Sequence, residues 1–451
     1  MTTTTDDSPT SAVKLPPGPR IPRAIQGVAA LANRRVAVEM LRRRYGSAFT
    51  VDVPIFGRLV VLSDPDQIRE LFRTSLEFAD TIDTSLGRVT GPNSLFALTG
   101  DRYRAHRKLL TPPFHGRRLA VYEAIVEQEA VKEFASWPHD RTLATMPSMT
   151  VITLNVMLRA VLGADGHELD RLREMLPPAI RLGSNLVLLP VPQWDWGRWS
   201  PWGRFRQYRR EYDAIVDQLI DKAKADPHLD ARDDVLSLMV QSRYEDGSPM
   251  TRSEIADELI TFLAAGHETT ATSLAWAVER IQRHPQLLNR LVADIDSGSD
   301  ELLDATVLEV LRTRPSVDIT FRQVKSPTLQ IGPWTLPQGQ TIIAAIGLLH
   351  ADEAVFPDAR RFDADRFLTR PPDPAEFIPY GGGVRRCIGA AFATMEMRVV
   401  LRTLLRTFVI SPSTARDERQ QSRRVSITPS RGARVRVRPR RNSPAINGVS
   451  R

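Results

Sequence analysis

The residue with the clearest chemical potential is Cys387, the only cysteine among 451 residues. Three consecutive glycines at 381–383 precede it and allow a tight turn and close approach of the backbone to a bulky planar group. The apolar run 390–397 that follows predicts a helix whose positive end lies beside the sulfur. Such a setting favours the thiolate, which suggests an axial ligand of haem. A buried cysteine that serves only packing is the alternative.

The residues around this cysteine follow a recognisable order. Tyr380, Gly383, Arg385, Cys387 and Gly389 match the pattern aromatic-x-x-Gly-x-Arg-x-Cys-x-Gly, and the stretch resembles the haem-binding loop of cytochrome P450 monooxygenases. The family usually has Phe where this chain has Tyr380, a change that keeps the ring and adds a hydroxyl. The resemblance implies haem b (iron protoporphyrin IX) as cofactor, with Cys387 as the iron ligand and the other four residues in contact with the cofactor.

A second motif interrupts a long helical pattern over residues 251–283. Gly266, Glu268 and Thr269 lie near its middle, where a glycine costs a helix about 1 kcal/mol relative to alanine. A threonine hydroxyl there can bond back to the carbonyl four residues earlier and bend the helix, and such local costs tend to mark functional sites. The segment resembles the acid–alcohol motif of the same family, which implies that Thr269 hydrogen-bonds dioxygen and that Glu268 helps to deliver protons. Taken alone, these side chains could equally cap or solvate a helix.

One rival chemistry is disfavoured by spacing. His267 and Glu268 begin like the zinc-protease pattern H-E-x-x-H, but Ala271 stands where the second histidine is required. The other histidines show no metal-ligand spacing, so the sequence argues against a zinc enzyme.

Charged residues between the two motifs are expected to hold the fold and the haem loop. Glu309 and Arg312 are three residues apart, which places them on one face of a helix. They resemble the family's Glu-x-x-Arg motif, with Arg366 as the third partner. Removing one member of such a buried charged network typically costs about 3–5 kcal/mol.

Arginines are the expected partners of the two haem propionates, because a planar guanidinium suits a carboxylate. The resemblance makes Arg107, Arg322 and Arg385 candidates, with Tyr103 where the family has Trp. Each arginine alone is more often a surface charge. His106, next to Arg107, could add a contact to the propionates, but we expect it to be an exposed helical histidine.

The residues that the resemblance places beside the substrate are mostly small or apolar. Asp318 is the exception, and it either orients a polar group of the substrate or is a solvated loop residue. The pocket candidates are Ala264, Ala265, Val317, Asp318, Ile319, Ile427 and Thr428.

Four of the seven tryptophans lie in one short loop, at positions 194, 196, 199 and 202. The loop lies between two helical patterns, in a place that resembles the mobile lid of the family. An aromatic lid indicates an apolar substrate, or contact with a membrane or a carrier surface. Closure of a small separate core is an equally good interpretation.

Length and composition indicate one large globular domain. No Gly/Ser-rich linker or internal repeat occurs between about residues 20 and 436, and 42% hydrophobic with 25% charged residues is ordinary for a soluble protein. We expect a flexible Pro-rich segment at 1–20, a single haem-thiolate domain at 21–437 and a basic disordered tail at 438–451.

The predicted fold class is mainly α with small β-sheets. Helical periodicity dominates from about residue 65 to 314, and a further helix is expected near 36–45. Alternating patterns predict strands at 49–53, 58–62, 328–331, 334–336, 341–345 and within 425–438. The resemblance implies the cytochrome P450 fold, a triangular helical prism with haem between the long oxygen-binding helix and the cysteine-loop helix.

The chain start lacks the order of a signal peptide, no apolar run approaches 20 residues, and one cysteine excludes an intrachain disulfide. We therefore expect a cytoplasmic protein without a transmembrane anchor, similar to the soluble bacterial, and more narrowly actinobacterial, branch of the family. The net charge of +8 would suit nucleic acid, but much of it lies in alternating Arg and Val near the C-terminus, typical of a strand with one solvated face. Steering of an acidic electron carrier is the functional alternative.

The resemblance spans about residues 15–436 and implies a monooxygenase that inserts one oxygen atom from O2 into a hydrophobic organic substrate. Electrons would come from NAD(P)H through a separate ferredoxin and reductase, because no flavin or nicotinamide module fits in this length. One alternative is a peroxide-driven or isomerising haem-thiolate enzyme, which would not need Glu268 and Thr269. The other is a non-catalytic haem sensor or basic binding protein.

Overall fold

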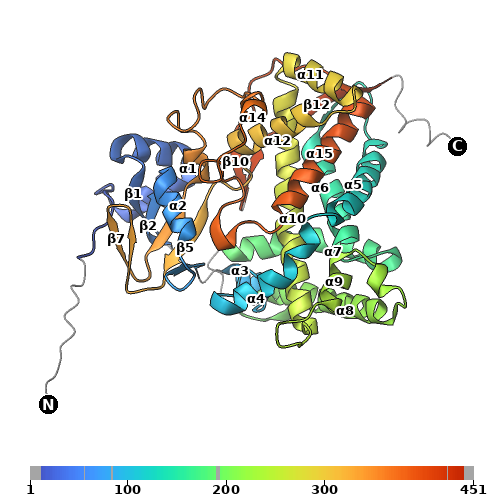
Figure 1. Ribbon diagram of the computed structural model, residues 1–451, viewed down its shortest axis with the longest axis horizontal. Helices are drawn as coiled ribbons and strands as arrows, with labels where there is room; N and C mark the ends of the chain where they lie inside the picture. The colour runs from blue at the N-terminus through green and yellow to red at the C-terminus, as the bar shows by residue number, and fades with distance from the viewer. Residues whose placement is uncertain (1–11, 55, 83–84, 189–192, 424, 441–451) are drawn as a thin grey trace. The chain divides into compact units, whose positions relative to one another are not determined.

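The computed structural model describes residues 12–54, 56–82, 85–188, 193–423 and 425–440. Its contacts divide the chain into two compact units. The first, here called the sheet unit, comprises Met1–Ile82, Asp318–Ala359 and Asp373–Arg386. The second, the helical unit, comprises Asp83–Val317, Arg360–Pro372 and Cys387–Arg451. Figure 1 colours the chain along its length and labels the elements of both units.

The sheet unit is built on five strands in the order β1-β2-β8-β5-β3, in which β2 and β8 run parallel and the other neighbours antiparallel. A separate hairpin pairs β6 with β7. The elements of this unit are α1 (Arg23–Tyr45), β1 (Ala48–Val53), β2 (Gly57–Leu62), α2 (Pro65–Arg73), β3 (Ala79–Asp80), β5 (Thr320–Val324), β6 (Thr328–Ile331), β7 (Trp334–Pro337), β8 (Thr341–Ala344), α13 (Ile346–Leu349) and the 3-10 turn η4 (Gly383–Arg385).

Alternation along the strands gives this sheet two apolar faces. Phe49, Val61 and Ile343 belong to one buried cluster, whereas Val60 and Ile342, their neighbours in the chain, belong to the other. Successive side chains of a strand point to opposite faces, so a strand buried on both sides reads as a continuous apolar run. Helix α1 contacts β1 and packs on the cluster that contains Phe49.

The helical unit holds most of the helices. Its elements are α3 (Ser85–Thr90), α4 (Gly100–Leu110), η1 (Pro112–Phe114), α5 (Arg118–Phe134), β4 (Thr142–Ala144), α6 (Thr145–Ala160), α7 (Gly166–Leu188), η2 (Gly197–Trp199), α8 (Pro201–Ala225), η3 (Leu229–Ala231), α9 (Val235–Gln241), α10 (Arg252–Ile281), α11 (Pro285–Asp296), α12 (Glu301–Thr313), α14 (Arg366–Thr369), α15 (Ala390–Thr407), β9 (Phe408–Ile410), β10 (Gln420–Arg423), β11 (Ser426–Pro429) and β12 (Arg434–Pro439). Strands β4, β12 and β9 form one small sheet, and β10 pairs with β11.

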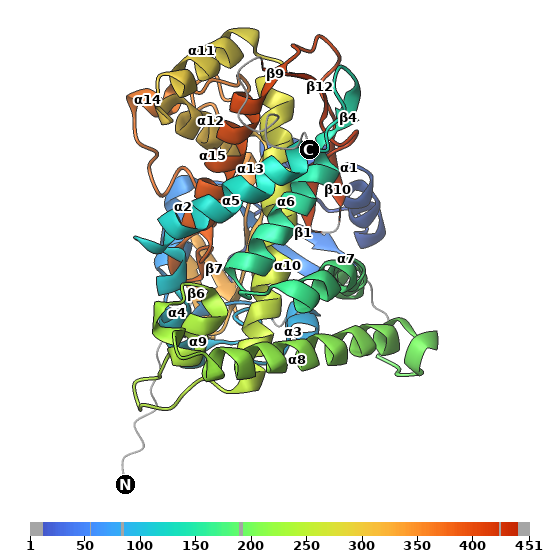
Figure 2. The ribbon, with the colours of Figure 1, turned by 90° about the vertical axis from the view of Figure 1, so that its right-hand side faces the viewer.

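The long helix α10 is the centre of this unit. It contacts α6, α15, α12 and α8, and Figure 2 shows it running lengthwise with α6 and α5 in front of it. Thr251 and Glu254 form a capping box at its start, each side chain accepting a hydrogen bond from the other's backbone N–H. The helix expected over residues 251–283 is therefore confirmed.

The mainly helical class with small sheets is confirmed, and so are the strands expected around positions 49–62 and 328–345. Strand β5 was not predicted. Its half-buried residues include polar Thr320 and Gln323, yet β8 and β3 pair with it on either side. Helix α1 also begins earlier than expected, at Arg23.

The expected terminal segments fall only partly within the described residues. Strand β12 continues through Pro439, paired with Phe408, so residues 438 and 439 belong to a sheet and not to a tail. Residues 1–11 and 441–451 lie outside the described residues, and the single haem domain over 21–437 stays a prediction. In the described part of the chain, no helix combines the length and apolar composition that crossing a bilayer requires.

Candidate active site

Cys387 lies three positions before the first residue of α15 and is exposed. The helix that follows is anchored by buried side chains such as Phe392 and Val399, and it contacts α5, α10 and α12. The thiol is therefore accessible beside the N-terminal end of a fixed helix, where the dipole and the first N–H groups favour an anion. The helix predicted over 390–397 is confirmed and extends to Thr407.

Beyond its exposed first turn, α10 is buried except for a partly exposed stretch near its middle. Residues 255–263 and 270–282 are buried without a break, whereas Ala264, Ala265, Gly266, Glu268 and Thr269 are only partly buried. Helix α15 packs against α10 within the same unit. The sequence motif thus coincides with an accessible patch on a helix whose neighbour carries Cys387 at its start.

Hydrogen bonds within α10 hold this patch. The Thr269 hydroxyl donates to the Ala265 carbonyl at 2.6 Å, which is the backward bond expected from the sequence. From α6, the Thr153 hydroxyl donates to the His267 carbonyl at 2.9 Å. Gly266 has a packing reason, because a Cβ added there would lie 2.8 Å from the Met157 Cε of α6. The patch is thus pinned to α6 as well.

Helix α4 places Tyr103 and Arg107 together. The Arg107 guanidinium donates to the Tyr103 hydroxyl at 2.9 Å, and Tyr103 is buried. The expectation of an exposed His106 is wrong, since this ring is buried and lies 2.8 Å from the Tyr244 hydroxyl and 3.3 Å from a Glu258 carboxylate oxygen. Burial raises the pKa of Glu258, while the nearby His106 opposes that rise. The many basic residues of this helix, such as Arg104, Arg107 and Lys108, gave no sign that the face of His106 is buried.

Glu309 and Arg312 form a bidentate ion pair in α12. Two guanidinium nitrogens of Arg312 donate to the two carboxylate oxygens of Glu309, each at 2.7 Å, and both side chains are fully buried. Arg366 at the start of α14 lies 3.7 Å from the same carboxylate, and the Asp363 N–H donates to it at 2.9 Å. The three residues expected to meet are thus together.

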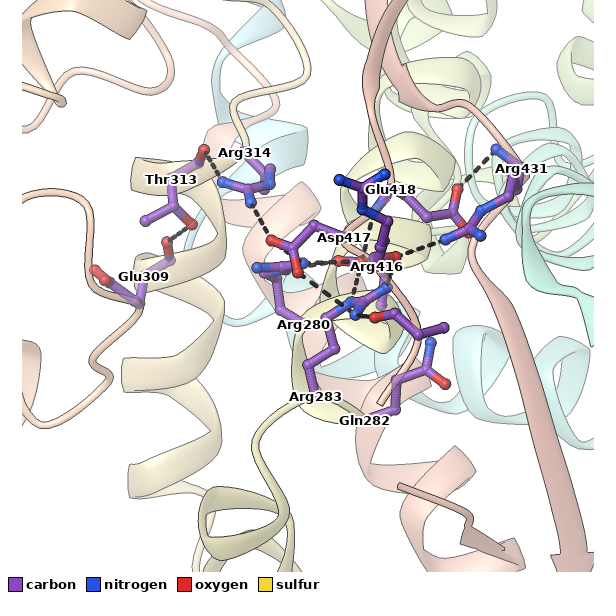
Figure 3. Close-up of polar contacts among 12 residues, drawn as sticks. Arg280, Gln282, Arg283, Glu309, Thr313, Arg314, Arg416, Asp417, Glu418 and Arg431 are labelled. Atoms are coloured by element: carbon purple, nitrogen blue, oxygen red, sulfur yellow. Dashed lines mark hydrogen bonds and ion pairs between the residues drawn. The ribbon is translucent and has the colours of Figure 1, made fainter. Parts of the chain in front are cut away.

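A further polar network, which the sequence did not indicate, connects the end of α12 with the end of α10 (Figure 3). Arg280, Arg283 and Arg314 surround Asp417 with nitrogen–oxygen distances of 3.1, 3.4 and 3.7 Å. The hydrogen bonds from Arg280 and Arg283 outweigh burial and hold the pKa of the fully buried Glu279 below its ordinary value. These groups fix the loop before β10 onto the two helices.

Within the sheet unit, Arg322 and Arg385 have protein partners. Arg385 donates to one Asp80 oxygen at 2.9 and 2.5 Å, and both side chains are buried. Arg322 donates to the carbonyls of Gly382 and Phe321 at 3.0 and 2.7 Å.

The glycines before the cysteine are required by the aromatic side chain and backbone of α2. A Cβ on Gly382 would lie 2.1 Å from the Phe72 ring, and one on Gly383 would lie 2.3 Å from the Phe72 carbonyl oxygen. Gly383 also has a φ of +65°. Tyr380, just before them, is partly buried, and Gly389 has nothing within 4 Å of an added Cβ.

The pocket candidates differ in how accessible they are. Ile427 and Thr428 are buried in β11, where the Ile427 carbonyl accepts the Trp276 indole N–H at 2.8 Å. Asp318 is paired with Arg34 of α1 at 2.5 Å, a partner that neither expectation for it included. The remaining candidates, Ala264, Ala265, Val317 and Ile319, are partly buried.

The tryptophan loop divides between the two expected roles. Trp202 is buried with Phe205 and Leu186 in a small separate core. In contrast, Trp194, Trp196 and Trp199 are exposed by 59%, 64% and 78%. Satellite packing therefore explains one indole, and three remain on the surface of the helical unit.

Glu396 is the candidate that sequence reasoning missed. It is fully buried in α15, nine residues after Cys387, and neither carboxylate oxygen has a hydrogen-bond partner among the described residues. Burial raises its pKa well above the ordinary range, because no partner in the described part of the chain compensates the lost hydration of the charged form. Its position between the apolar residues Met395 and Met397 was the sequence feature that could have indicated its burial.

Comparisons with known proteins agree on one family. Residues 16–436 match the cytochrome P450 family model. The chain is 49% identical over 428 residues to cytochrome P450 138 of Mycobacterium tuberculosis, covering 95% of this chain and 97% of the relative. It is 40% identical over 450 residues to cytochrome P450 135B1 of the same organism, covering 98% and 95%.

Solved structures show the same fold. The retinoic acid-bound cyanobacterial CYP120A1 matches with a TM-score of 0.81 at 22% identity, over 95% of this chain and all of that one. The haem domain of cytochrome P450DA matches with a TM-score of 0.83 at 21% identity, over 95% and 98%. With nearly the whole chain matched, this protein belongs to the cytochrome P450 family, whose members are monooxygenases with a haem-thiolate cofactor.

Proposed function

We propose that this protein inserts one oxygen atom of O2 into a hydrophobic organic substrate, with electrons from a separate ferredoxin and its reductase. The observation that carries the proposal is the accessible Cys387 at the start of α15, because a family with a thiolate ligand and a chain with one cysteine leave one candidate. Haem bound through a thiolate supplies the chemistry of O–O bond cleavage.

The described residues fit such a group. Cys387 offers an accessible sulfur beside a helix N-terminus, and the glycines at 382 and 383 keep the loop close to α2. We propose that Cys387 is the iron ligand and that Arg107, Arg322 and Arg385 bind the propionates, with Tyr103 positioning Arg107. We propose contacts with the cofactor for Tyr380, Gly383 and Gly389 as well.

Thr269 and Glu268 are proposed to control proton delivery. The Thr269 hydroxyl donates its proton in a hydrogen bond to the Ala265 carbonyl, and its oxygen keeps lone pairs that can accept a hydrogen bond from a neighbouring donor on the patch. Glu268 supplies a carboxyl group next to it on the partly exposed patch of α10. Apolar Ala264 and Ala265 on that patch, with Val317, Ile319, Ile427 and Thr428, are proposed to favour an apolar substrate. Asp318, which pairs with Arg34, is proposed to orient a polar group of the substrate.

The remaining parts of the proposal concern the scaffold and the partners. Glu309, Arg312 and Arg366 are proposed to hold the fold, since Glu309 and Arg312 form a bidentate buried pair and Arg366 lies 3.7 Å from the same carboxylate. The net charge of +8 supports steering of an acidic ferredoxin. A cytoplasmic location is proposed on the cysteine count, because one cysteine cannot form an intrachain disulfide.

Labelled oxygen gives the decisive test. Substrates are first found by spin-state titration of the haem protein, then turned over with NADPH, ferredoxin, reductase and 18O2. The expected product carries one 18O atom. The iron ligand is tested separately: the reduced wild-type protein under carbon monoxide is expected to show the red-shifted Soret band of thiolate ligation, and Cys387→Ser is expected to abolish that band. Turnover with peroxide alone, and none with surrogate reductases, would favour the peroxide-driven alternative instead.

A further inference from the structure

Helix α1 of the sheet unit carries large apolar side chains on the side that faces solvent. Ile25, Val28, Val36 and Met40 are exposed by 54%, 66%, 52% and 65%. Their spacings of three, eight and four residues place them along one side of a helix. Scattered apolar residues are normal on protein surfaces, but a row along one helix marks an interaction surface.

The opposite side of α1 is already used by the fold. Val38, Leu41 and Tyr45 pack against the cluster that contains Phe49. Gly27 lies close to Pro54, the residue that follows β1, so that a Cβ added to Gly27 would be 2.7 Å from the Pro54 Cδ. The helix is therefore held on the sheet by one side, and the exposed row contributes nothing to that packing.

The charges on α1 have one dominant sign. The helix contains six arginines and one glutamate. Four of the arginines pair with acidic residues of the same unit: Arg23 with Asp52, Arg34 with Asp318, Arg42 with Asp352 and Arg43 with Glu39. Arg35, Arg43 and Arg44 are exposed and lie within or beside the apolar row. Arg35 also interacts electrostatically with Asp318 and Glu39.

We propose that Ile25, Val28, Val36 and Met40, together with Arg35, Arg43 and Arg44, bind the surface of an anionic lipid bilayer. We call these seven residues the α1 surface. A helix of 23 residues is about 34 Å long, and it can lie in the plane of the interface with its apolar row at the acyl boundary. The arginines then meet anionic head groups.

Other occupants fit the α1 surface less well. In a symmetric dimer, two copies of α1 would bring their excess of arginines over glutamate together, and like charges repel. Residues 1–11 of the same chain contain only Thr, Asp, Ser and Pro after Met1, so they offer no apolar side chains to cover the row. A lipid surface satisfies both the apolar and the cationic groups.

Vesicle co-sedimentation of the full-length haem-loaded protein tests this. We expect binding to phosphatidylcholine vesicles that contain phosphatidylglycerol to exceed binding to pure phosphatidylcholine at least tenfold, and to weaken with salt. Replacing the row by Ile25→Gln, Val28→Gln, Val36→Gln and Met40→Gln keeps helix propensity and is expected to lower binding at least tenfold. The charge variant Arg35→Gln, Arg43→Gln, Arg44→Gln is expected to do the same, at about fivefold per arginine.

Matched variants separate this surface from general stickiness. Val121→Gln, Val151→Gln and Val409→Gln remove apolar residues of the helical unit that are 45%, 43% and 38% exposed, and they are expected to leave vesicle binding unchanged. Far-UV circular dichroism and the haem absorption spectrum check that every variant is folded. Catalysis plays no part in the assay, so its outcome is independent of the proposed function.

Three outcomes would overturn the proposal. The first is no preference of the wild-type protein for anionic vesicles. The second is an α1 apolar variant that binds vesicles as tightly as the wild type. If the variant Trp194→Ser, Trp196→Ser, Trp199→Ser loses vesicle binding in the same assay, the tryptophan loop is the lipid-binding surface instead. The third is a wild-type protein that does not bind vesicles and that forms a dimer by light scattering, when the α1 apolar variant is a monomer.

Discussion

The Thr269 hydroxyl donates a hydrogen bond to the Ala265 carbonyl at 2.6 Å, on the partly exposed patch of an otherwise buried helix. The same bond occurs three residues later, where the buried Thr272 hydroxyl donates to the Glu268 carbonyl at 2.8 Å. The two threonines therefore make equivalent contacts within α10 and differ in access to the patch. This pair allows a structural role to be separated from a role in proton delivery.

Thr269→Val should uncouple electron consumption from product formation. Valine keeps the shape of the side chain but removes the hydroxyl, so protons reach oxygen by a less direct path and hydrogen peroxide is released. Product formed per NADPH consumed is expected to fall severalfold, and Thr269→Ser is expected to restore most of it. General acid–base groups commonly contribute factors of about 10²–10⁴ in rate.

Thr272→Val is the matched control for that measurement. It removes an equivalent backward hydrogen bond from the same helix without touching the patch. It should leave the ratio of product to peroxide as in the wild type. Equal uncoupling by both valine variants would show that Thr269 acts through the helix and not through its hydroxyl.

Glu309→Gln is expected to destabilise the haem protein by about 3–5 kcal/mol, because it leaves a fully buried Arg312 without its charged partner. Urea unfolding of the haem-loaded protein measures the change. Arg290→Gln is the control: it breaks the Arg290–Asp365 pair, whose side chains are 52% and 50% exposed, and should cost at most about 1 kcal/mol. Similar midpoints for the two variants would contradict the assigned scaffold role.

Gly383→Ala is expected to cost at least about 2 kcal/mol and to lower haem content. Two effects add: a φ of +65°, which costs a residue with a Cβ about 1–2 kcal/mol, and a contact of 2.3 Å with the Phe72 carbonyl. Gly381→Ala separates them, since Gly381 has a φ of +67° but its nearest neighbour, Thr320, would lie 3.9 Å away. If both variants lose equal stability in urea, backbone strain alone is responsible.

Local patterns sufficed to identify the family, the helical class, α10 and the helix after Cys387. They sufficed because a thiolate loop and a capped periodic helix are each encoded within a short stretch. The pairing of Glu309 with Arg312 also follows from a spacing of three on one helix. The chemical roles of these residues remain predictions.

Features that depend on distant partners were not predictable in this way. Strand β5 is defined by β8 and β3 on its two sides, and His106 is buried by Tyr244 and Glu258, which are far away in the sequence. The first half of α1 was missed for a different reason. There the apolar Ile25 and Val28 are exposed while the polar Gln26 is buried, which reverses the contrast that marks an amphipathic helix.

Glu396→Gln is expected to stabilise the protein, increasingly so as the pH rises. The folded-state pKa of Glu396 is raised well above the ordinary value of 4.5 by burial, so between 4.5 and that raised value the folded protein holds a proton that the unfolded chain has released. In that window the free energy of unfolding of the wild type falls with pH by about 1.4 kcal/mol per unit from this group alone. Glutamine has no proton to hold, and it keeps the size of the side chain.

Urea unfolding of the two haem-loaded proteins over a pH series that starts below 4.5 therefore gives a diagnostic difference. The variant's advantage should be absent below about pH 4.5 and should grow above it until the raised folded-state pKa is reached. Parallel stability curves would mean that the carboxylate is ionised and satisfied in the folded state, in which case Glu396 must gain a cationic or hydrogen-bonding partner when haem is bound. Activity measured on Glu396→Gln then distinguishes a purely structural acid from a proton donor. If Glu396 donates protons in the reaction, the variant forms product more slowly although it is more stable; if the acid is only structural, product formation is unchanged.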